Sequence, residues 1–237
     1  KYYGYSLYSF CKNTPVSRID LDGQDDYRFD NKSGQFIMME QNNNSKDRVL
    51  GYHLDKKTGE YTKNHRWYQR KTLIDNIEKG ILSDGINFRD NNNLIAVGGD
   101  GQASVDGVET FALRLSEIVG KEIGGAYFSK DEAMETTHIS IGHYNDNLQK
   151  RVNGVNGQLS WTQVHPGSKI EDNITGFFHT HPSGPNINDI DRLRASAVDL
   201  ESRDSQLEKI PSLRFYIITA PEYRSEKYPL KKEYTND

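Results

Sequence analysis

The sequence has only one cysteine, Cys11, among its 237 residues. A single cysteine excludes an intramolecular disulfide bond, a zinc site built from several thiolates, and the cysteine-containing zinc centre of nucleobase deaminases. The chain also lacks any run of about 18 apolar residues, so it predicts no transmembrane helix. Its net charge is −4 and its pI about 6.0, which gives no general electrostatic attraction for nucleic acid. We therefore expect neither nucleic acid nor a membrane as its partner.

Apolar residues are also scarce, at 34% of the chain, but an aromatic share of 11% can still supply a core. Fourteen tyrosines, together with many asparagines and glycines, favour a chain rich in strands and turns. The first residue is Lys1 rather than methionine, and no signal peptide follows it. We expect the chain to be a fragment of a longer protein.

The first region, residues 1–23, is rich in tyrosine and contains two turn signals, Asn13-Thr14-Pro15 and Asp20-Leu21-Asp22-Gly23. It resembles the end of the core of Rhs (YD-repeat) proteins, where this order of motifs comes before a variable C-terminal tip. Thr14 takes the place of the asparagine that is commoner there. The resemblance implies that residues 1–23 are a remnant of an Rhs core and that the remainder is the tip of a polymorphic toxin.

The second region, residues 24–105, consists of short apolar and aromatic runs separated by polar residues and glycine. It predicts strands of a meander, with a hairpin turn at Lys57-Thr58-Gly59. The strands are expected at 27–29, 36–39, 48–52, 61–68 and 94–97. Over 71–82, apolar residues recur at helical spacing and predict a helix. We find no catalytic group in this region and predict that it is a β-rich connector or accessory segment.

The third region, residues 106–237, has the pattern of a mixed α/β (α+β) domain. Apolar residues recur on one face of a predicted helix over 108–119, which Gly120 ends. A second helix is predicted over 196–209, before Pro211. Strands are predicted at 123–128, 137–144, 160–164, 174–178 and 213–219.

The strand at 174–178 leads directly into His179-Thr180-His181-Pro182-Ser183-Gly184. Residues two apart in a strand point to the same face, so both imidazoles can aim at one ion. Zinc commonly takes imidazole ligands, and a catalytic zinc has three protein ligands and one position for water. A His-x-His pair alone is weak evidence, whereas His-x-His-Pro-Ser-Gly after an apolar strand is much more specific.

The histidine pair and the later Ser196-Ala-Val-Asp199 together resemble the JAMM motif of JAB/MPN metallopeptidases. The resemblance extends over residues 108–221 and implies a JAB/MPN-like mixed sheet with flanking helices. It further implies Zn²⁺ as the cofactor, held by His179, His181 and Asp199. Ser196 would lie beside the open coordination position and donate a hydrogen bond to the oxyanion. Taken alone, Ser-x-x-Asp is a capping box at the start of a helix.

The loop between the histidine pair and Ser196 is longer than is common in that family. Asp191, with Asn188 at the serine position, would restore a nearly standard loop and is the alternative third ligand. We prefer Asp199 because it keeps a true serine and the helix-then-strand spacing of the family.

The resemblance also implies a general base. Family members carry a glutamate in a Glu-x-x-Gly pattern between the first helix and the next strand, and Glu122-Ile-Gly-Gly125 matches this pattern. A carboxylate there takes a proton from the attacking water and passes it to the leaving amine. The other acids nearby, Glu117, Glu132 and Glu135, are weaker candidates.

Together these features imply a zinc-dependent peptidase or isopeptidase toxin, secreted as part of an Rhs-type protein and acting inside a target cell. Its expected partners are an unidentified protein substrate and a cognate immunity protein. Two alternatives remain: a metal-dependent nuclease tip, and a catalytically idle JAMM-like module that only binds a partner.

Overall fold

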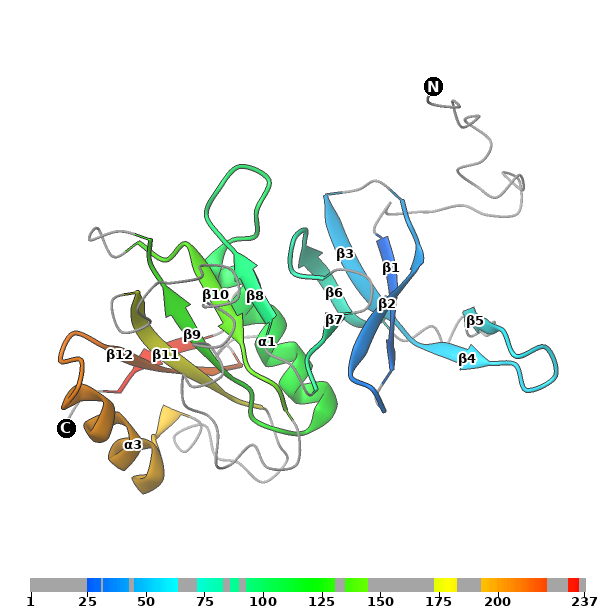
Figure 1. Cartoon of the computed structure of the whole chain (residues 1–237). Helices are drawn as coiled ribbons and strands as arrows, with labels where there is room; N and C mark the ends of the chain where they lie inside the picture. The colour runs from blue at the N-terminus through cyan, green and yellow to red at the C-terminus, as the bar shows by residue number, and fades with distance from the viewer. Residues whose placement is uncertain are drawn as a thin grey trace.

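A computed structural model shows a strand-rich α+β fold with two main sheets and two helices in the described residues (Figure 1). It describes residues 25–30, 32–42, 45–63, 72–82, 86–89, 93–130, 135–144, 173–182, 193–220 and 230–234. The mixed α/β class predicted from the sequence is confirmed. Residues 1–23, which carry the Rhs resemblance, and the strand predicted at 160–164 lie outside the described residues.

The first sheet comes from the N-terminal part of the described chain and has the strand order β6-β3-β1-β2-β7. Its strands are β1 (Asp25–Asp30), β2 (Gln35–Glu40), β3 (Lys46–Leu50), β6 (Thr72–Glu78) and β7 (Ile86–Asn87). β1 and β2 form an antiparallel hairpin, but β3 lies beside β1 and runs parallel to it. The predicted meander is therefore wrong, because in a meander β3 would pair with β2.

Buried ion pairs accompany this arrangement of β1 and β3. Asp26 is fully buried and accepts a hydrogen bond of 2.5 Å from Nε of Arg48. The ammonium group of Lys79, just after β6, contacts the carboxylates of both Asp25 and Asp47. Buried carboxylates are tolerated only when they are paired. These contacts therefore favour β3 beside β1, where each acid finds a cation.

The helix predicted over 71–82 is also wrong, since this segment forms β6. Ile74 and Ile77 are both buried although they are three residues apart, which is a helical spacing. Ile74 pairs with Val49 and Ile77 with Asp47, so two residues of β6, Asp75 and Asn76, lie opposite one residue of β3, Arg48. A β-bulge of this kind adds one residue to a strand, and Asn76 adopts the left-handed φ of 56° inside it. The bulge, not a helix, brings both isoleucines to the core face.

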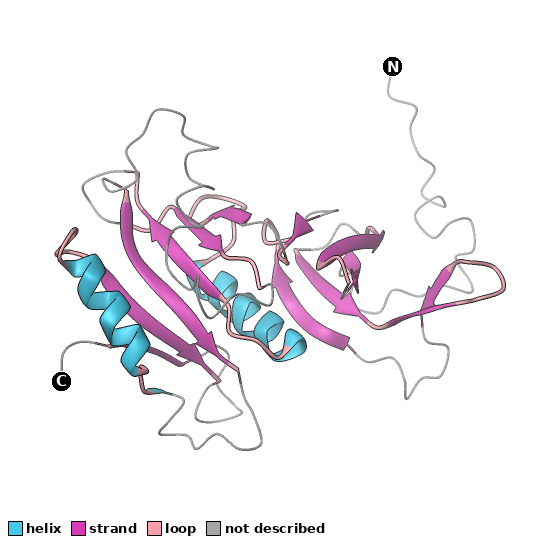
Figure 2. Cartoon of the chain, turned by 60° about the horizontal axis from the view of Figure 1, so that its bottom comes forward, coloured by secondary structure: helices cyan, strands magenta, loops and turns pink. Residues whose placement is uncertain are grey.

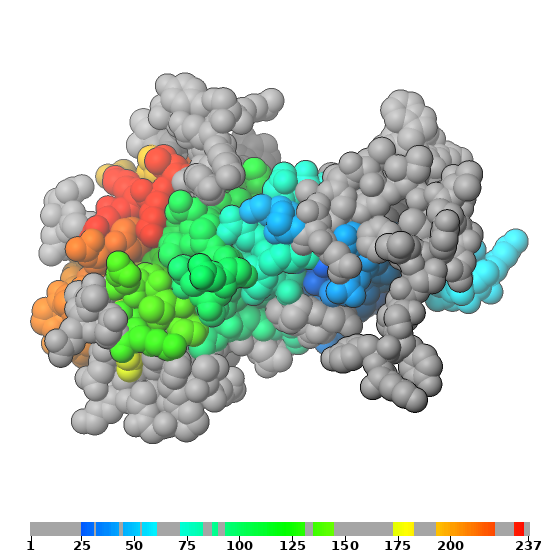
Figure 3. All heavy atoms as spheres, turned by 90° about the horizontal axis from the view of Figure 1, so that it is seen from above, coloured from blue at the N-terminus to red at the C-terminus, as the bar shows by residue number. Residues whose placement is uncertain are grey.

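A two-stranded hairpin of β4 (Tyr52–Leu54) and β5 (Tyr61–Lys63) extends from the first sheet, away from the second (Figures 1 and 3). The predicted turn is confirmed, because Gly59 has a φ of 73° and its N–H donates to the carbonyl of Asp55 at 2.8 Å. Only 61–63 of the strand predicted at 61–68 are described, and the remainder lies outside the described residues.

The second sheet has the order β13-β12-β11-β9-β10-β8. Its strands are β8 (Asn93–Ala96), β9 (Gly124–Phe128), β10 (His138–Ile141), β11 (Ile174–His181), β12 (Arg214–Thr219) and β13 (Leu230–Glu233). β11 is an inner strand, parallel to β12 and antiparallel to β9. The strands predicted around 94–97, 123–128, 137–144, 174–178 and 213–219 are confirmed. β11 differs in one respect that matters, because it continues to His181.

The two helices cover opposite faces of the second sheet (Figure 2). α1 (Val105–Val119) begins at the N-cap Ser104 and ends at Gly120, whose φ of 67° is left-handed. α3 (Ala197–Leu207) begins at the N-cap Ser196. Both predicted helices are confirmed, α1 starting three residues earlier than expected.

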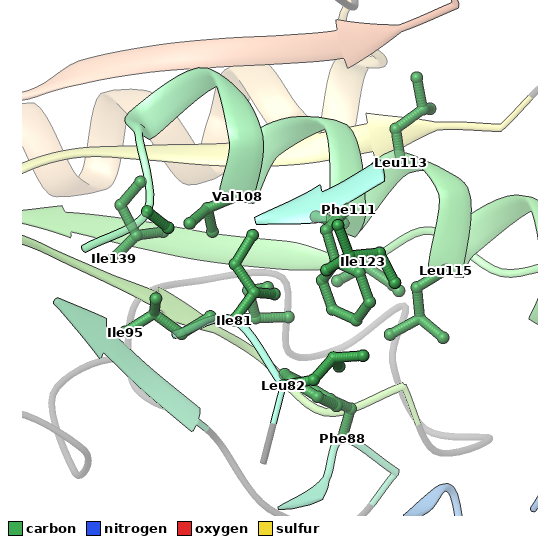
Figure 4. Close-up of a cluster of buried hydrophobic side chains, with 14 of the residues drawn as sticks. Ile81, Leu82, Phe88, Ile95, Val108, Phe111, Leu113, Leu115, Ile123 and Ile139 are labelled. Atoms are coloured by element: carbon green, nitrogen blue, oxygen red, sulfur yellow. The ribbon is translucent and has the colours of Figure 1, made fainter. Parts of the chain in front are cut away.

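α1 also joins the two sheets into one body. Its buried face, with Val108, Phe111 and Leu115, packs against Ile139 of the second sheet (Figure 4). The same core includes Ile77 of the first sheet. In addition, Oε2 of Glu78 at the end of β6 accepts the N–H of Ser104 at 2.6 Å, next to the start of α1. β8, although it falls in the segment 24–105, pairs with β10 in the second sheet. Among the described residues no helix is long and apolar enough to cross a membrane.

Gly125 in β9 allows Phe178 of β11 to pack against the backbone. A Cβ atom at this position would lie 2.3 Å from the Phe178 ring and 2.5 Å from the carbonyl oxygen of Ser140. We predict that Gly125→Ala lowers the free energy of unfolding by about 1–3 kcal/mol, because the strand must shift to relieve overpacking. Urea denaturation measures the change. An unaltered midpoint would contradict the tight approach of Phe178 to β9.

Candidate metal centre

The two histidines at the end of β11 face the same point, as the sequence predicted. Nε2 of His179 lies 3.0 Å from Nε2 of His181, and the ring centroids are 4.8 Å apart. Along the same strand Phe177 packs on the α3 side, whereas Phe178 packs in the core shared with α1. The alternation of a strand therefore places both imidazoles on the side of α3. His179 is buried, and His181 is partly exposed at the strand end.

Asp199 approaches the pair from the first turn of α3. Its Oδ2 lies 3.8 Å from Nε2 of His179. One ligand atom from each of His179, His181 and Asp199 falls within 4.8 Å of the others, so this group can hold a metal ion. The alternative ligand, Asp191, and its companion Asn188 lie outside the described residues. Within the part of the chain that the structure describes, this is the one group with these properties.

The geometry fits a small divalent ion. Two nitrogens bound to one tetrahedral zinc at 2.0–2.1 Å lie about 3.3 Å apart. The observed separations, 3.0 Å between the histidine nitrogens and 3.8 Å from His179 to Asp199, lie on either side of that value. Two imidazoles and a carboxylate suit zinc, and they also suit other divalent transition metals. The group is thus a candidate metal centre, and its geometry does not select one metal.

Ser196 and Asp199 form a capping box at the start of α3. The backbone N–H and the hydroxyl of Ser196 both donate to Oδ2 of Asp199, each at 2.7 Å, and Oγ of Ser196 lies 3.3 Å from the N–H of Asp199. These bonds fix the carboxylate toward β11 and satisfy N–H groups that a helix start leaves without partners. In this arrangement the hydroxyl proton of Ser196 is directed at Asp199, and its predicted bond to an oxyanion stays a prediction.

Glu122 lies on the other side of the pair, in the segment between α1 and β9. Its Oε1 is 3.8 Å from Nε2 of His181. About half of the Glu122 side chain is exposed (51%), and the partial burial of its carboxylate raises the pKa of this group. The imidazole of His181 lowers the same pKa, and the carboxylate of Asp199 raises it further. The structure therefore brings the predicted base next to the ligand group. Glu117, a weaker candidate, pairs with Arg114 on α1 instead, and Glu132 lies outside the described residues.

Burial controls the protonation of His179. Removal from water disfavours the imidazolium form and lowers the pKa of His179 to about 4; the Asp199 carboxylate opposes this shift and His181 adds to it. The ring is therefore neutral near pH 7, which is the form that binds a metal.

The structure adds Tyr234, a residue that the sequence analysis did not select. Its ring centroid lies 5.8 Å from that of His179 and 5.9 Å from that of Phe215, and its N–H donates to the carbonyl of Phe215 at 3.0 Å. Burial, with a smaller effect from Asp199, raises the pKa of its phenol. Tyr234 forms part of a depression between α3 and the sheet, together with Phe177, His179, Asp199, Ser202, Gln206 and Phe215. No motif indicated Tyr234, since pairing of β13 with β12 alone brings it there.

The edge strand β13, which ends directly before Tyr234, is anchored on the opposite face of the sheet. The ammonium of Lys231 in β13 donates to Oε1 of the buried Glu109 at 2.6 Å. It also lies 4.5 Å and 4.3 Å from the ring centroids of Tyr127 and Tyr216. Cation–π contacts and a hydrogen bond to a buried carboxylate together stabilise the position of this ammonium group. This anchor fixes β13 and, with it, the position of Tyr234.

His138 and His143 are not part of the group. His143 is buried, and Nδ1 of His138 lies 3.1 Å from Oγ1 of Thr137. His65 and His165 lie outside the described residues.

No protein-family model matches the sequence, and a search of curated proteins found no match.

The third metal ligand can be tested by substitution. We predict that His179→Ala and Asp199→Asn lower the affinity for a divalent metal by at least tenfold, because each removes one of three ligands. Asp191→Asn is the matched control and should retain the metal. Elemental analysis of the purified full-length chain after dialysis measures the content. Loss of metal from Asp191→Asn and retention in Asp199→Asn would reverse the assignment.

The lowered pKa of His179 predicts how the stability of the metal-free protein depends on pH. Between pH 6.5 and 4 the unfolded chain binds a proton that the folded chain excludes, so stability falls as the pH falls through this range. The total loss is up to about 3 kcal/mol, is complete near pH 4 and is absent above pH 7. Urea denaturation in the presence of a chelator, at several pH values, measures it.

His179→Gln should flatten this pH dependence, because the titrating group is gone, whereas His138→Gln should leave it unchanged. Equal slopes for His179→Gln and the wild-type protein would show that another group causes the loss.

Proposed function

We propose that the chain is a zinc-dependent peptidase or isopeptidase that resembles the JAMM metallopeptidases. The observation that carries the proposal is the joint placement of His179, His181 and Asp199 with Glu122 at the end of one strand. An N,N,O ligand group with a separate carboxylate beside it is the arrangement that metal-assisted hydrolysis needs. The order of α1, β9, β11, α3 and β12 also agrees with the order that the resemblance implies.

In this proposal the ligand group and the base have separate tasks. A bound zinc ion supplies Lewis acidity, which polarises an amide carbonyl and acidifies water. His179 as a neutral imidazole, His181, and Asp199 oriented by Ser196 would hold the ion in place. Glu122 accepts a proton from the attacking water on its carboxylate and delivers it to the leaving nitrogen. The raised pKa of Glu122 suits this task, because a base must also return the proton.

The charges around the site give the nuclease alternative no support. A nuclease needs cations that contact phosphates. Arg203, the basic residue of α3 near the site, is buried and bound to Asp204 at 2.7 Å and 2.9 Å. Arg194 is exposed two residues before Ser196, but Glu122 and Asp199 place two carboxylates beside the histidine pair, and their negative charge disfavours a phosphate there. An amide substrate, which carries no phosphate charge, fits this environment better.

The biological setting follows from the resemblance of residues 1–23 to an Rhs core. We propose that the chain acts as the tip of an Rhs-type toxin, inside a target cell and on a protein substrate. A cognate immunity protein would then protect the producing cell.

Glu122→Gln tests the role of the base. We expect it to retain metal, since Glu122 is not in the ligand group, and to lose amide hydrolysis by about 10²–10⁴-fold. The measurements are the metal content and the rate of cleavage of peptide and isopeptide substrates by the full chain. Glu117→Gln, whose carboxylate pairs with Arg114 within α1, is the control and should keep the wild-type rate.

Three outcomes contradict the proposal. Full activity of Glu122→Gln would show that Glu122 is not the base. Activity that survives treatment with a chelator would show that hydrolysis needs no metal. Metal binding without hydrolysis of any peptide or isopeptide bond would favour the idle binding module instead.

A further inference from the structure

Thr180, between the two histidines, points to the opposite face of β11 and is completely buried there. Its hydroxyl oxygen accepts the N–H of Ile123 at 2.9 Å, and its own N–H donates to the carbonyl of Ile123 at 2.9 Å. Both hydrogen bonds therefore go to one residue, and that residue directly follows Glu122.

These two bonds extend the contact between β9 and β11 beyond the regular strand pairing. The ladder between the strands ends at the pair of His179 and Gly124. At the next position the side chain of Thr180 supplies the acceptor for the N–H of Ile123. The side chain of Ile123 is itself buried in the core under α1. The residue after Glu122 is thus fixed by two hydrogen bonds and by packing.

A valine would fill nearly the same volume and has an equally high preference for strands. It would, however, leave the N–H of the buried Ile123 without this acceptor. Neither the strand propensity nor the packing of β11 thus explains a threonine at this position. The hydrogen bond to Ile123 does, and its effect is to hold the backbone beside Glu122.

We propose that Thr180 is the positioning residue for Glu122. This role rests on the proposed function above. The His-Thr-His segment then serves two purposes on its two faces. His179 and His181 hold the metal on one face, and Thr180 on the other face fixes the backbone from which Glu122 reaches His181 at 3.8 Å. Displacement of a reacting group by about 1 Å can cost on the order of 100-fold in rate.

Thr180→Val is the direct test. We expect it to retain the metal and the KM of the wild-type chain while kcat falls by about 10–100-fold. Thr180→Ser, which keeps the hydroxyl, should restore most of the rate. Thr175→Val is the matched control, because the hydroxyl of Thr175 also bonds from β11 to β9, donating to the carbonyl of Tyr127 at 3.4 Å, but at the far end of the strand.

The double variant Thr180→Val/Glu122→Gln shows whether Thr180 acts through Glu122. If it does, Thr180→Val causes no further loss once Glu122 is replaced. Amide hydrogen exchange of Ile123 provides a measurement that does not depend on activity, and it should become at least tenfold faster in Thr180→Val. If this variant does not fold, Thr180→Ala and Thr180→Ser take its place in the same comparison.

A wild-type kcat for Thr180→Val, or an equal loss in the Glu122→Gln background, would overturn the positioning role while the proposed function stands. If the wild-type chain cleaves no amide bond, the proposed function fails and the role of Thr180 fails with it. In that case the exchange rate of Ile123 still reports whether the contact between Thr180 and Ile123 exists.

Discussion

The alternation of side chains along β11 is the constraint on which the site depends. An inner strand, paired on both edges with β9 and β12, cannot rotate, so successive residues from Gly176 to His181 must face α1 and α3 in turn. The strand continues to His181, and both imidazoles therefore point to the side on which α3 begins. If the strand ended at Phe178, the histidines would lie in a loop and nothing in the backbone would hold them together.

The same alternation places the candidate metal ligands on one face of β11 and the groups that support the backbone on the other. On the α3 side, His179 loses its contact with water, and this burial keeps the imidazole neutral. On the α1 side, Phe178 packs over Gly125 and Thr180 bonds to Ile123. The second sheet separates these two sides, and the backbone next to Glu122 is held through Ile123 on the side that carries no candidate metal ligand.

Much of the site could be predicted from the sequence because its signals are local. An apolar run before His-x-His predicts a strand end, and Ser196-x-x-Asp199 predicts a helix start, each from residues a few positions apart. The structure of the first sheet was harder to predict from the sequence. Two residues of β6 lie opposite one of β3 at the bulge that contains Asn76, so that buried residues recur at a spacing that mimics a helix. The parallel pairing of β1 with β3 is accompanied by ion pairs of buried carboxylates with distant residues, which no local pattern reveals.

The sequence by itself determined which residues can act as ligands and as the base, because side-chain chemistry and spacing within one strand or one helical turn are local properties. Tertiary structure alone decided which of them meet. The pairing of β9 with β11 brings Glu122 to His181, and α3 on the outer face brings Asp199 to His179. β13, anchored by Lys231, brings Tyr234 against His179. These contacts join residues many positions apart, and only the packing of whole strands and helices can establish them.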